Sequence, residues 1–316
     1  MAWHPDMARI IEAVHSAPSI FGQQPWEAVL AGEARDRVDL YADAGRVPAD
    51  ISPREVAISC GAALYNLRLA LRVAGRELSV WMLPGLDQGS PLIDHLTATR
   101  VLVASVEIMP DRIDPPTADI QELYEAMWLR HINPGEYAAQ QVPLPLLVEM
   151  ENAAAEEHGW LRILHPRQQK AILRATVRGG ELAARDMQLM TLSTDDDRPL
   201  DWLRAGQALQ HALLTGTRYS MSSGPGRSER YRASLKYRVS DFHPLHPPDR
   251  VPAGYGVTAS FLTQSLERED QQGIPRAWPW PTYYNEVPQV VLQVGFAPVE
   301  RVPAPPLFEA EPTETE

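Results

Sequence analysis

The feature that most constrains the fold of this chain is an order of predicted elements that occurs twice. In each half, a helical segment is followed by a short strand, a long apolar helix and an apolar strand. The first long helix, expected to begin at Ser52, contains Gly-Ala-Ala-Leu at residues 61–64, and the second contains Gly-Gln-Ala-Leu at 206–209. An order that repeats in this way indicates either an internal duplication or a chance alignment of two core helices.

The residues after these two tetrapeptides also match, with Leu67 beside Ala212 and Leu69 beside Leu214. Any two core helices rich in alanine and leucine align somewhere, so the helices alone leave both alternatives open. The repeated order of elements favours duplication. Duplication predicts an α+β fold in which two related α/β halves form a pseudo-dimer within one chain, with the long helices packed at its centre.

Composition and the repeated order of elements indicate how the chain is divided. We expect the first half at residues 1–115 and the second at 116–300. Residues 222–256, inside the second half, are rich in glycine, proline, serine and arginine and have little periodicity. They are interpreted as an insertion that forms either a lid over a site or a surface excursion. Residues 301–316 are rich in proline and acidic residues and are expected to form an arm.

Hydrophobic periodicity and turn residues predict the individual elements. Ser52 followed by Pro53 is typical of a helix N-terminus, and Gly75 of the end of that helix. The predicted helices are 7–15, 52–75, one that ends near Arg130, 144–159, 167–180 and 201–218. The predicted strands are 24–32 and 36–43, which form a hairpin, then 77–84, 99–108, 160–166, 187–194 and 288–296. Of these, 99–108 is apolar enough to lie inside a sheet.

Charge and cysteine content exclude several classes of protein. The chain has 316 residues, with 29 Lys and Arg against 41 Asp and Glu, a formal net charge of −12 and no basic patch, which argues against nucleic-acid binding. Its single cysteine, Cys60, excludes an intramolecular disulfide and cysteine-rich metal sites. The sequence shows no signal peptide or membrane-length apolar run, so we expect a soluble, cytoplasmic protein without a membrane partner.

Common catalytic motifs are absent from the sequence. It contains neither a GxxxxGK(S/T) phosphate loop nor a GxGxxG turn between a strand and a helix, and it lacks a GxSxG nucleophile elbow and an HExxH zinc helix. His243 and His246 lie close in sequence, but the prolines beside them explain a stiff loop equally well, so no metal site is expected. Cys60 is expected in the core rather than as a nucleophile.

The segment with the clearest chemical content is Ala-Pro-Ser-Ile-Phe-Gly-Gln-Gln-Pro-Trp at residues 17–26. A turn of this composition is expected to leave backbone N–H groups and small polar side chains free. Two interpretations are open. The segment is either a helix-to-strand connection with Trp26 anchored in the core, or a platform for a flat heterocycle.

This segment, together with several others, resembles the Acg family, a branch of the FMN-dependent nitroreductase superfamily. The other matching segments are 40–43, 59–71, 201–218, 259–267 and 289–298, so that the resemblance runs from about residue 7 to 300 apart from 222–256. In the superfamily two subunits exchange elements and bind FMN at their interface. In the Acg branch two such halves are fused and one flavin site is retained. The resemblance therefore implies a flavoprotein, with NAD(P)H as a possible electron donor, and agrees with a duplication.

The resemblance also implies flavin-binding residues. The family's Pro-Ser turn, which borders the isoalloxazine ring, matches residues 18–19, and a glutamine follows near the ring edge. Its Arg-x-Thr-Asn-Arg motif, which contacts phosphate and ring oxygens, resembles residues 130–134, where the first arginine and the asparagine match. One arginine lies near the place where the family has several after its last strand. The residues implied to bind FMN are Pro18, Ser19, Gln24, Arg130, Asn133 and Arg301.

The chain departs from the family's pattern at several positions. Gly22 stands where the family has asparagine, Ile132 and Pro134 replace threonine and arginine, and residues 304–305 are Ala-Pro instead of arginines. Each lost charge-assisted contact to the phosphate costs about 1.5–3 kcal/mol. Basic residues of the insertion either compensate or form a solvated stretch; they are Arg227, Arg230, Arg232 and Lys236.

Two functions therefore remain open from the sequence. The first is an FMN-dependent oxidoreductase, in which the flavin transfers the hydride or electrons and no side chain is needed as a catalytic acid or base. The second is a catalytically inactive relative that sequesters flavin, or a flavin-free interaction protein. We expect a small-molecule ligand, and either a monomeric pseudo-dimer or a homodimer.

Overall fold

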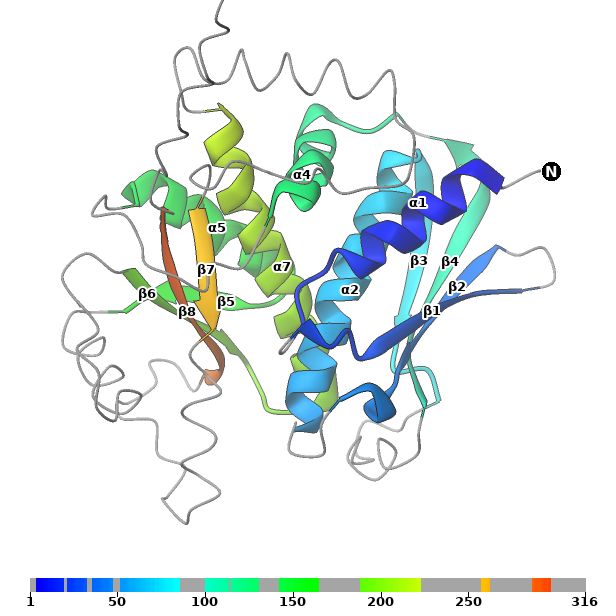
Figure 1. Ribbon diagram of the computed structural model, residues 1–316, viewed down its shortest axis with the longest axis horizontal. Helices are drawn as coiled ribbons and strands as arrows, with labels where there is room; N and C mark the ends of the chain where they lie inside the picture. Colours follow the sequence, from blue (N-terminus) through cyan, green and yellow to red (C-terminus); the bar gives the residue numbers. More distant parts are fainter. Residues whose placement is uncertain are drawn as a thin grey trace, which may run out of the picture.

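The computed structural model describes residues 4–19, 22–32, 36–47, 52–85, 100–113, 115–130, 142–164, 188–222, 257–261 and 286–296. The helices in these ranges are α1 (His4–His15), the 3-10 helix η2 (Ala44–Arg46), α2 (Pro53–Val73), α4 (Ala118–Leu129), α5 (Leu144–Glu156) and α7 (Pro199–Ser222). The strands are β1 (Trp26–Ala31), β2 (Arg37–Ala42), β3 (Arg76–Met82), β4 (Val101–Ile113), β5 (Trp160–Ile163), β6 (Gln188–Thr194), β7 (Val257–Phe261) and β8 (Val287–Phe296). Figure 1 shows their arrangement.

The strands form two four-stranded sheets with the same kind of strand order. The first sheet runs β1-β2-β4-β3 and the second β5-β6-β8-β7, and all neighbouring strands are antiparallel. The hairpin of β1 and β2 and the inner position of β4 confirm the sequence predictions. Strand β7 has no sequence prediction, because five residues after an aperiodic segment are too few to show a period.

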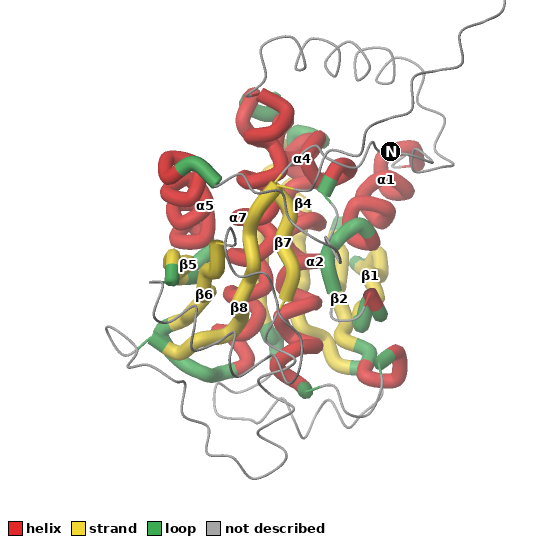
Figure 2. The backbone as a smooth tube through the Cα atoms, turned by 60° about the vertical axis from the view of Figure 1, so that its left-hand side comes forward, coloured by secondary structure: helices red, strands yellow, loops and turns green. Residues whose placement is uncertain are grey.

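The two long helices α2 and α7 lie between the sheets. Figure 1 shows β1 to β4 on one side of this helix pair and β5 to β8 on the other, and Figure 2 shows the same layers from a second direction. Helix α2 packs on strands of the first sheet and α7 on strands of the second, while α1 packs against α2, α5 against α7, and α4 against both long helices. The mixed α/β architecture with long helices at its centre agrees with the sequence analysis.

Helix α2 begins at a capping box. Ser52 Oγ accepts a hydrogen bond from the Glu55 backbone N–H at 3.3 Å, and the Glu55 carboxylate accepts one from the Ser52 backbone N–H at 2.9 Å. Pro53 occupies the first helical position, as predicted. At the other end, Gly75 has a φ of +73°, a conformation that favours glycine. These caps fix both ends of a helix that contributes Asn66 to the site described below.

Ser52→Ala is expected to lower the free energy of unfolding by about 1 kcal/mol, because it leaves the Glu55 N–H without its cap. Thr117 is a matched control. It is the N-cap of α4 and accepts a single bond from the Ile120 N–H at an exposed helix start. Urea denaturation measures both losses, and a loss at Thr117→Ala equal to or larger than that at Ser52→Ala would contradict the importance of the capping box.

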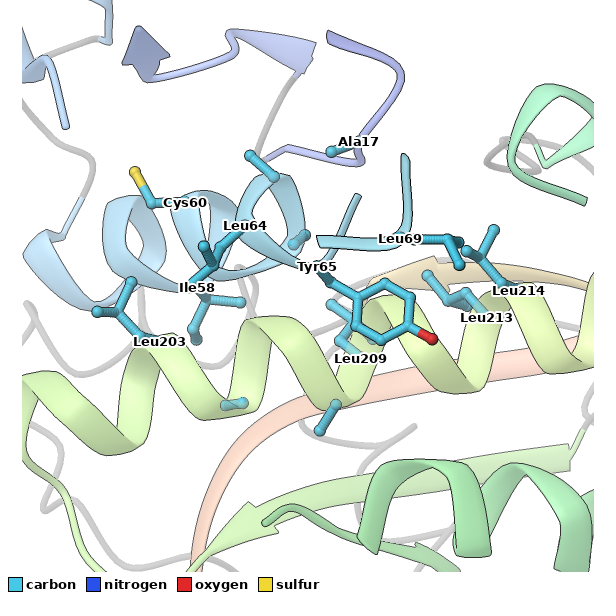
Figure 3. Close-up of a cluster of buried hydrophobic side chains, with 14 of the residues drawn as sticks. Ala17, Ile58, Cys60, Leu64, Tyr65, Leu69, Leu203, Leu209, Leu213 and Leu214 are labelled. Carbon is cyan, nitrogen blue, oxygen red and sulfur yellow. The ribbon is translucent and has the colours of Figure 1, made fainter. Parts of the chain in front are cut away.

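The two long helices cross at a pair of glycines. A Cβ atom added to Gly61 would lie 2.2 Å from the Leu203 carbonyl oxygen and 2.9 Å from the Gly206 Cα. A Cβ atom added to Gly206 would lie 2.0 Å from the Ile58 carbonyl oxygen. The helices therefore touch backbone to backbone, and Figure 3 shows the buried side chains that pack around this crossing.

Gly159 follows α5 and has a different role from the predicted one. It is the last residue of the helix predicted at 144–159, where a glycine is expected to end the helix, but α5 ends at Glu156 and the residue with a left-handed backbone is His158, with a φ of +62°. A Cβ atom at Gly159 would lie 2.5 Å from the Cβ of Ala208 and 3.0 Å from a methyl carbon of Leu192. Glycine fits here because the chain after α5 lies directly against α7 and β6.

Some sequence predictions concern residues outside the described ranges. They are the helix at 167–180, the insertion at 222–256 beyond its first residue, and the arm at 301–316. Within the described ranges, α2 alone has the length and apolar composition of a membrane span, and 83% of its most apolar window is buried inside the protein. The core helix of a soluble protein has the same properties.

Candidate functional site

Side chains from several elements meet at the C-terminal end of α1. The last carbonyl groups of a helix have no partner inside it. Gln24, in the turn that follows α1, donates from Nε2 to the His15 carbonyl at 2.8 Å. Arg130, at the end of α4, donates from Nη2 to the Ser16 carbonyl at 2.9 Å. The structure therefore brings two of the predicted residues, Gln24 and Arg130, to the same helix end.

The turn after α1 is more self-contained than its composition indicates. The Gly22 N–H donates to the Ser19 carbonyl at 3.1 Å, and the Gln24 N–H donates to Ser19 Oγ at 3.0 Å. The Trp26 N–H donates to the Gln24 carbonyl at 2.8 Å. These N–H groups are used within the turn, which corrects the expectation that they are free. Pro18, Ser19 and Trp26 are buried, and Trp26 is anchored in the core.

Arg130 is the cation of this site. Burial lowers the pKa of Arg130 to about 10, so its guanidinium remains protonated at neutral pH. Among the described residues, its buried Nε atom has no hydrogen-bond partner and no carboxylate forms an ion pair with the guanidinium. Arg130 is partly buried, and a cation that is partly removed from water without a counter-ion lacks the interactions that would offset its desolvation. Arg130 therefore offers the charge and the donor that a phosphate or carboxylate ligand requires.

Asn66 connects the end of α1 to α7. It is fully buried in α2 and donates from Nδ2 to the Ala13 carbonyl at 2.8 Å and to Ser16 Oγ at 3.0 Å. Its Oδ1 accepts a hydrogen bond from Gln210 Nε2, on α7, at 2.7 Å. Ser16 is thus bonded to Asn66 through its hydroxyl and to Arg130 through its carbonyl.

Three residues of this site have no sequence prediction: Ser16, Asn66 and Gln210. The signal that could identify the two amides is their place inside long apolar helices, where a polar side chain needs a buried partner. Asn133 and Arg301, which the family resemblance implies, lie outside the described residues, as do the basic residues of the insertion.

Tyr65 and His211 form another contact between α2 and α7. Their rings are stacked, with centroids 4.9 Å apart and planes inclined by 27°. Arg68 donates to the Glu157 carboxylate at 2.5 Å, and His211 Nδ1 lies 3.8 Å from the Glu156 carboxylate, too far for a hydrogen bond. Burial lowers the pKa of His211, an effect that the two nearby glutamates oppose only in part.

His211 is expected to make the protein less stable in mild acid. Its pKa is lower in the folded chain than in the unfolded chain, where histidine titrates near 6.5. The unfolded state therefore binds more protons below that pH, and the free energy of unfolding should fall as the pH drops from about 7 to about 5. His211→Gln should flatten this dependence. Equal pH slopes in the wild type and His211→Gln, measured by urea denaturation, would contradict the assignment.

Cys60 lies in the core, as predicted. It is fully buried, its thiol contacts the Pro25 carbonyl at 3.5 Å, and burial raises the thiol pKa. A thiol in this environment stays protonated, so it does not act as a nucleophile. The described residues contain no group of three or more His, Cys, Asp or Glu side chains that could hold a metal ion.

The fold is nitroreductase-like. The chain is similar to the crystal structure of a candidate nitroreductase from Anabaena variabilis, with a TM-score of 0.53 and 10% sequence identity, over 89% of this chain and 82% of that chain. A similarity at this level of identity concerns the fold. It confirms the coarser part of the resemblance, the nitroreductase-like fold, and leaves the Acg branch as an expectation.

Among curated proteins, the chain is similar to two uncharacterized proteins from two strains of Mycobacterium tuberculosis. Each is 38% identical to this chain in an alignment of 92 residues that covers 26% of this chain and 27% of the relative. The chain thus spans about a quarter of the length of the curated relatives it matches. No model of a known protein family matches the sequence.

Proposed function

We propose that this chain binds FMN at the end of α1 and acts as a flavin-dependent oxidoreductase of the Acg branch. The observation that carries the proposal is the protonated Arg130 guanidinium, which has a buried donor without a described partner. Its bond to the Ser16 carbonyl puts it beside the turn that the family resemblance assigns to the flavin. The nitroreductase-like fold supports the same proposal.

Among the described residues, Arg130 has the charge and the unpaired donor that would suit the phosphate end of FMN. This phosphate carries close to two negative charges and is bound by guanidinium groups or backbone N–H donors. Arg130 would hold the phosphate, while Pro18, Ser19 and Gln24 would border the ring. Asn133 and Arg301 belong to the proposed site through the family resemblance alone.

When bound, FMN supplies hydride and electron transfer, and we propose NAD(P)H as the donor and a small molecule as the acceptor. The chain's own residues would bind the flavin and fix its orientation. The turn after α1 has a fixed shape, because its N–H groups bond within it and Gln24 ties it to the His15 carbonyl. Arg130, held by the Ser16 carbonyl, fixes the anionic end of the ligand relative to this turn.

We also propose that the two halves arose by duplication and form a pseudo-dimer. Support comes from contacts that repeat with a constant offset of 145 residues (210 − 65 and 211 − 66). With this offset, Asn66 is equivalent to His211 and Gln210 is equivalent to Tyr65. Asn66 is bonded to Gln210, and the equivalent pair, His211 and Tyr65, is also in contact through stacked rings. A two-fold interface makes each contact twice in this way. The two glycines at the helix crossing have the same offset, and the two sheets have matching strand orders.

Titration of flavin-free protein with FMN and with riboflavin tests the proposed site. Riboflavin lacks the phosphate, so FMN should bind more tightly, and binding is followed by quenching of flavin fluorescence. A protein that binds neither flavin would contradict the proposal and favour a flavin-free interaction protein.

A catalytically inactive, flavin-sequestering protein is the second candidate. This candidate is favoured because Arg130 Nη2 already donates to the Ser16 carbonyl, which leaves fewer donors for a phosphate. The departures at Ile132 and Pro134 favour it too. Turnover separates the candidates: NADH or NADPH should bleach the flavin spectrum of an oxidoreductase without oxygen, and a quinone or nitroaromatic should restore it. Bound flavin that neither nucleotide reduces would identify a sequestering protein.

A further inference from the structure

Gln210 is a buried amide on α7 to which neither the sequence analysis nor the family resemblance assigns a role. Its side chain is fully buried, and its Nε2 donates to Asn66 Oδ1 at 2.7 Å. Its Oε1 is buried without a hydrogen-bond partner among the described residues. An unpaired buried acceptor destabilises the folded state, so stability alone does not account for glutamine at this position.

The orientation of the Asn66 amide depends on Gln210. Asn66 Nδ2 faces the Ala13 carbonyl and the Ser16 hydroxyl. Ser16 Oγ donates its own hydrogen to the Ala13 carbonyl at 2.8 Å, and it therefore accepts from Asn66. Asn66 Oδ1 consequently needs a donor on the opposite side, and Gln210 provides it. Without this donor, Oδ1 would be a buried acceptor that has lost its partner.

Ser16 links this amide to the cation of the site. The Ser16 hydroxyl is bonded to Asn66 and its carbonyl to Arg130 Nη2, so that a shift of Ser16 moves the group that holds the guanidinium. We propose that Gln210 is a positioning residue for the phosphate-binding arginine, acting through Asn66 and Ser16. This inference rests on the proposed FMN site and adds to it a residue from the other long helix.

The ratio of FMN affinity to riboflavin affinity measures this role, because only FMN carries the phosphate. We expect a ratio of about ten or more in the wild type. Gln210→Met keeps the side-chain length and removes the amide, and it should lower the ratio severalfold, toward the value of Arg130→Met. The double variant should lose little more than Arg130→Met alone, because both changes act on one contact.

Thr215→Val is the matched control, because Thr215 Oγ1 is also buried on α7 without a partner among the described residues. No hydrogen bond between described residues connects Thr215 to Ser16, so its ratio should equal that of the wild type. A second variant, Gln210→Glu, keeps the test decisive if Gln210→Met does not fold. Its protonated carboxyl donates to Asn66 as the amide does, whereas its carboxylate repels Oδ1. Because the FMN phosphate itself takes up a proton in mild acid, the ratio of Gln210→Glu is compared with the wild-type ratio at the same pH, and it should come closer to the wild-type ratio in mild acid than at alkaline pH.

The possible failures are distinguishable. A wild-type ratio in Gln210→Met, or an equal loss in Thr215→Val, would overturn the role of Gln210 and leave the FMN site in place. A Gln210→Glu ratio that stays at the same fraction of the wild-type ratio at every pH would also overturn it. If the wild type binds both flavins equally or binds neither, the proposed FMN site fails, and this inference fails with it.

Discussion

Gly61→Ala is expected to unfold the protein or to lower its free energy of unfolding by more than about 3 kcal/mol. In an ordinary helix interior alanine is more favourable than glycine by about 1 kcal/mol, so helix propensity predicts the opposite sign. The added methyl group would lie 2.2 Å from the Leu203 carbonyl oxygen. That oxygen belongs to the backbone of the other long helix, which does not rotate away as a side chain does. The helices would have to separate, and the side chains packed around the crossing would lose contact.

Urea denaturation followed by circular dichroism measures this effect. Gly45→Ala is the matched control, because its Cβ would lie 3.2 Å from a carboxylate oxygen of Asp43, a side-chain atom that can move. We expect a change below about 1 kcal/mol there. The double variant of Gly61→Ala and Gly206→Ala should cost less than the sum of the two single variants, because one separation accommodates both methyl groups. Wild-type stability in either single variant would contradict the backbone contact.

Arg130→Met is expected to weaken FMN binding by about 10- to 100-fold and to leave riboflavin binding nearly unchanged. The pKa of Arg130, about 10, keeps the guanidinium charged at neutral pH, so the variant loses a full positive charge and a buried donor. Methionine retains an apolar chain of comparable length, which limits the loss of packing. Fluorescence titration with both flavins measures the two affinities.

Arg204→Met is the control for this prediction. The Nε atom of Arg204 is also buried without a hydrogen-bond partner among the described residues, but its guanidinium lies 3.6 Å from the Asp201 carboxylate. Because Asp201 already balances this charge, the loss of Arg204 should leave FMN affinity unchanged. An FMN affinity in Arg130→Met equal to that of the wild type would remove the phosphate assignment.

Much of the fold could be predicted because its determinants are local. Ser52 and Gly75 bound α2 as expected, since capping and left-handed backbone preferences act within a few residues. The repeated Gly-x-Ala-Leu pattern places Gly61 and Gly206 at matching positions of the two long helices. Their contact, however, is a close approach of two backbones that lie far apart in sequence, and no periodicity encodes it. The packing role of Gly159 against Ala208 escaped prediction for the same reason.

The candidate site could be predicted only in part. The family resemblance pointed to Gln24 and Arg130, which the structure brings to one helix end. The bond between Asn66 and Gln210 joins positions 144 residues apart, so neither amide's partner can be identified from its neighbours in the sequence. The N–H groups of the turn after α1 were expected to be free, because composition does not reveal which of them bond within a turn.

An absorbance spectrum of the freshly purified protein, with any flavin released by heat and quantified, tests the proposed function most directly. We predict the bands of oxidised flavin and about one FMN per chain. We expect a single flavin because, in the proposed pseudo-dimer, the position equivalent to the Asn66–Gln210 pair holds the Tyr65–His211 stack. Arg68, beside that stack, is already paired with the Glu157 carboxylate. A purified protein that carries no flavin, and takes up none when FMN is added, would contradict the proposed function.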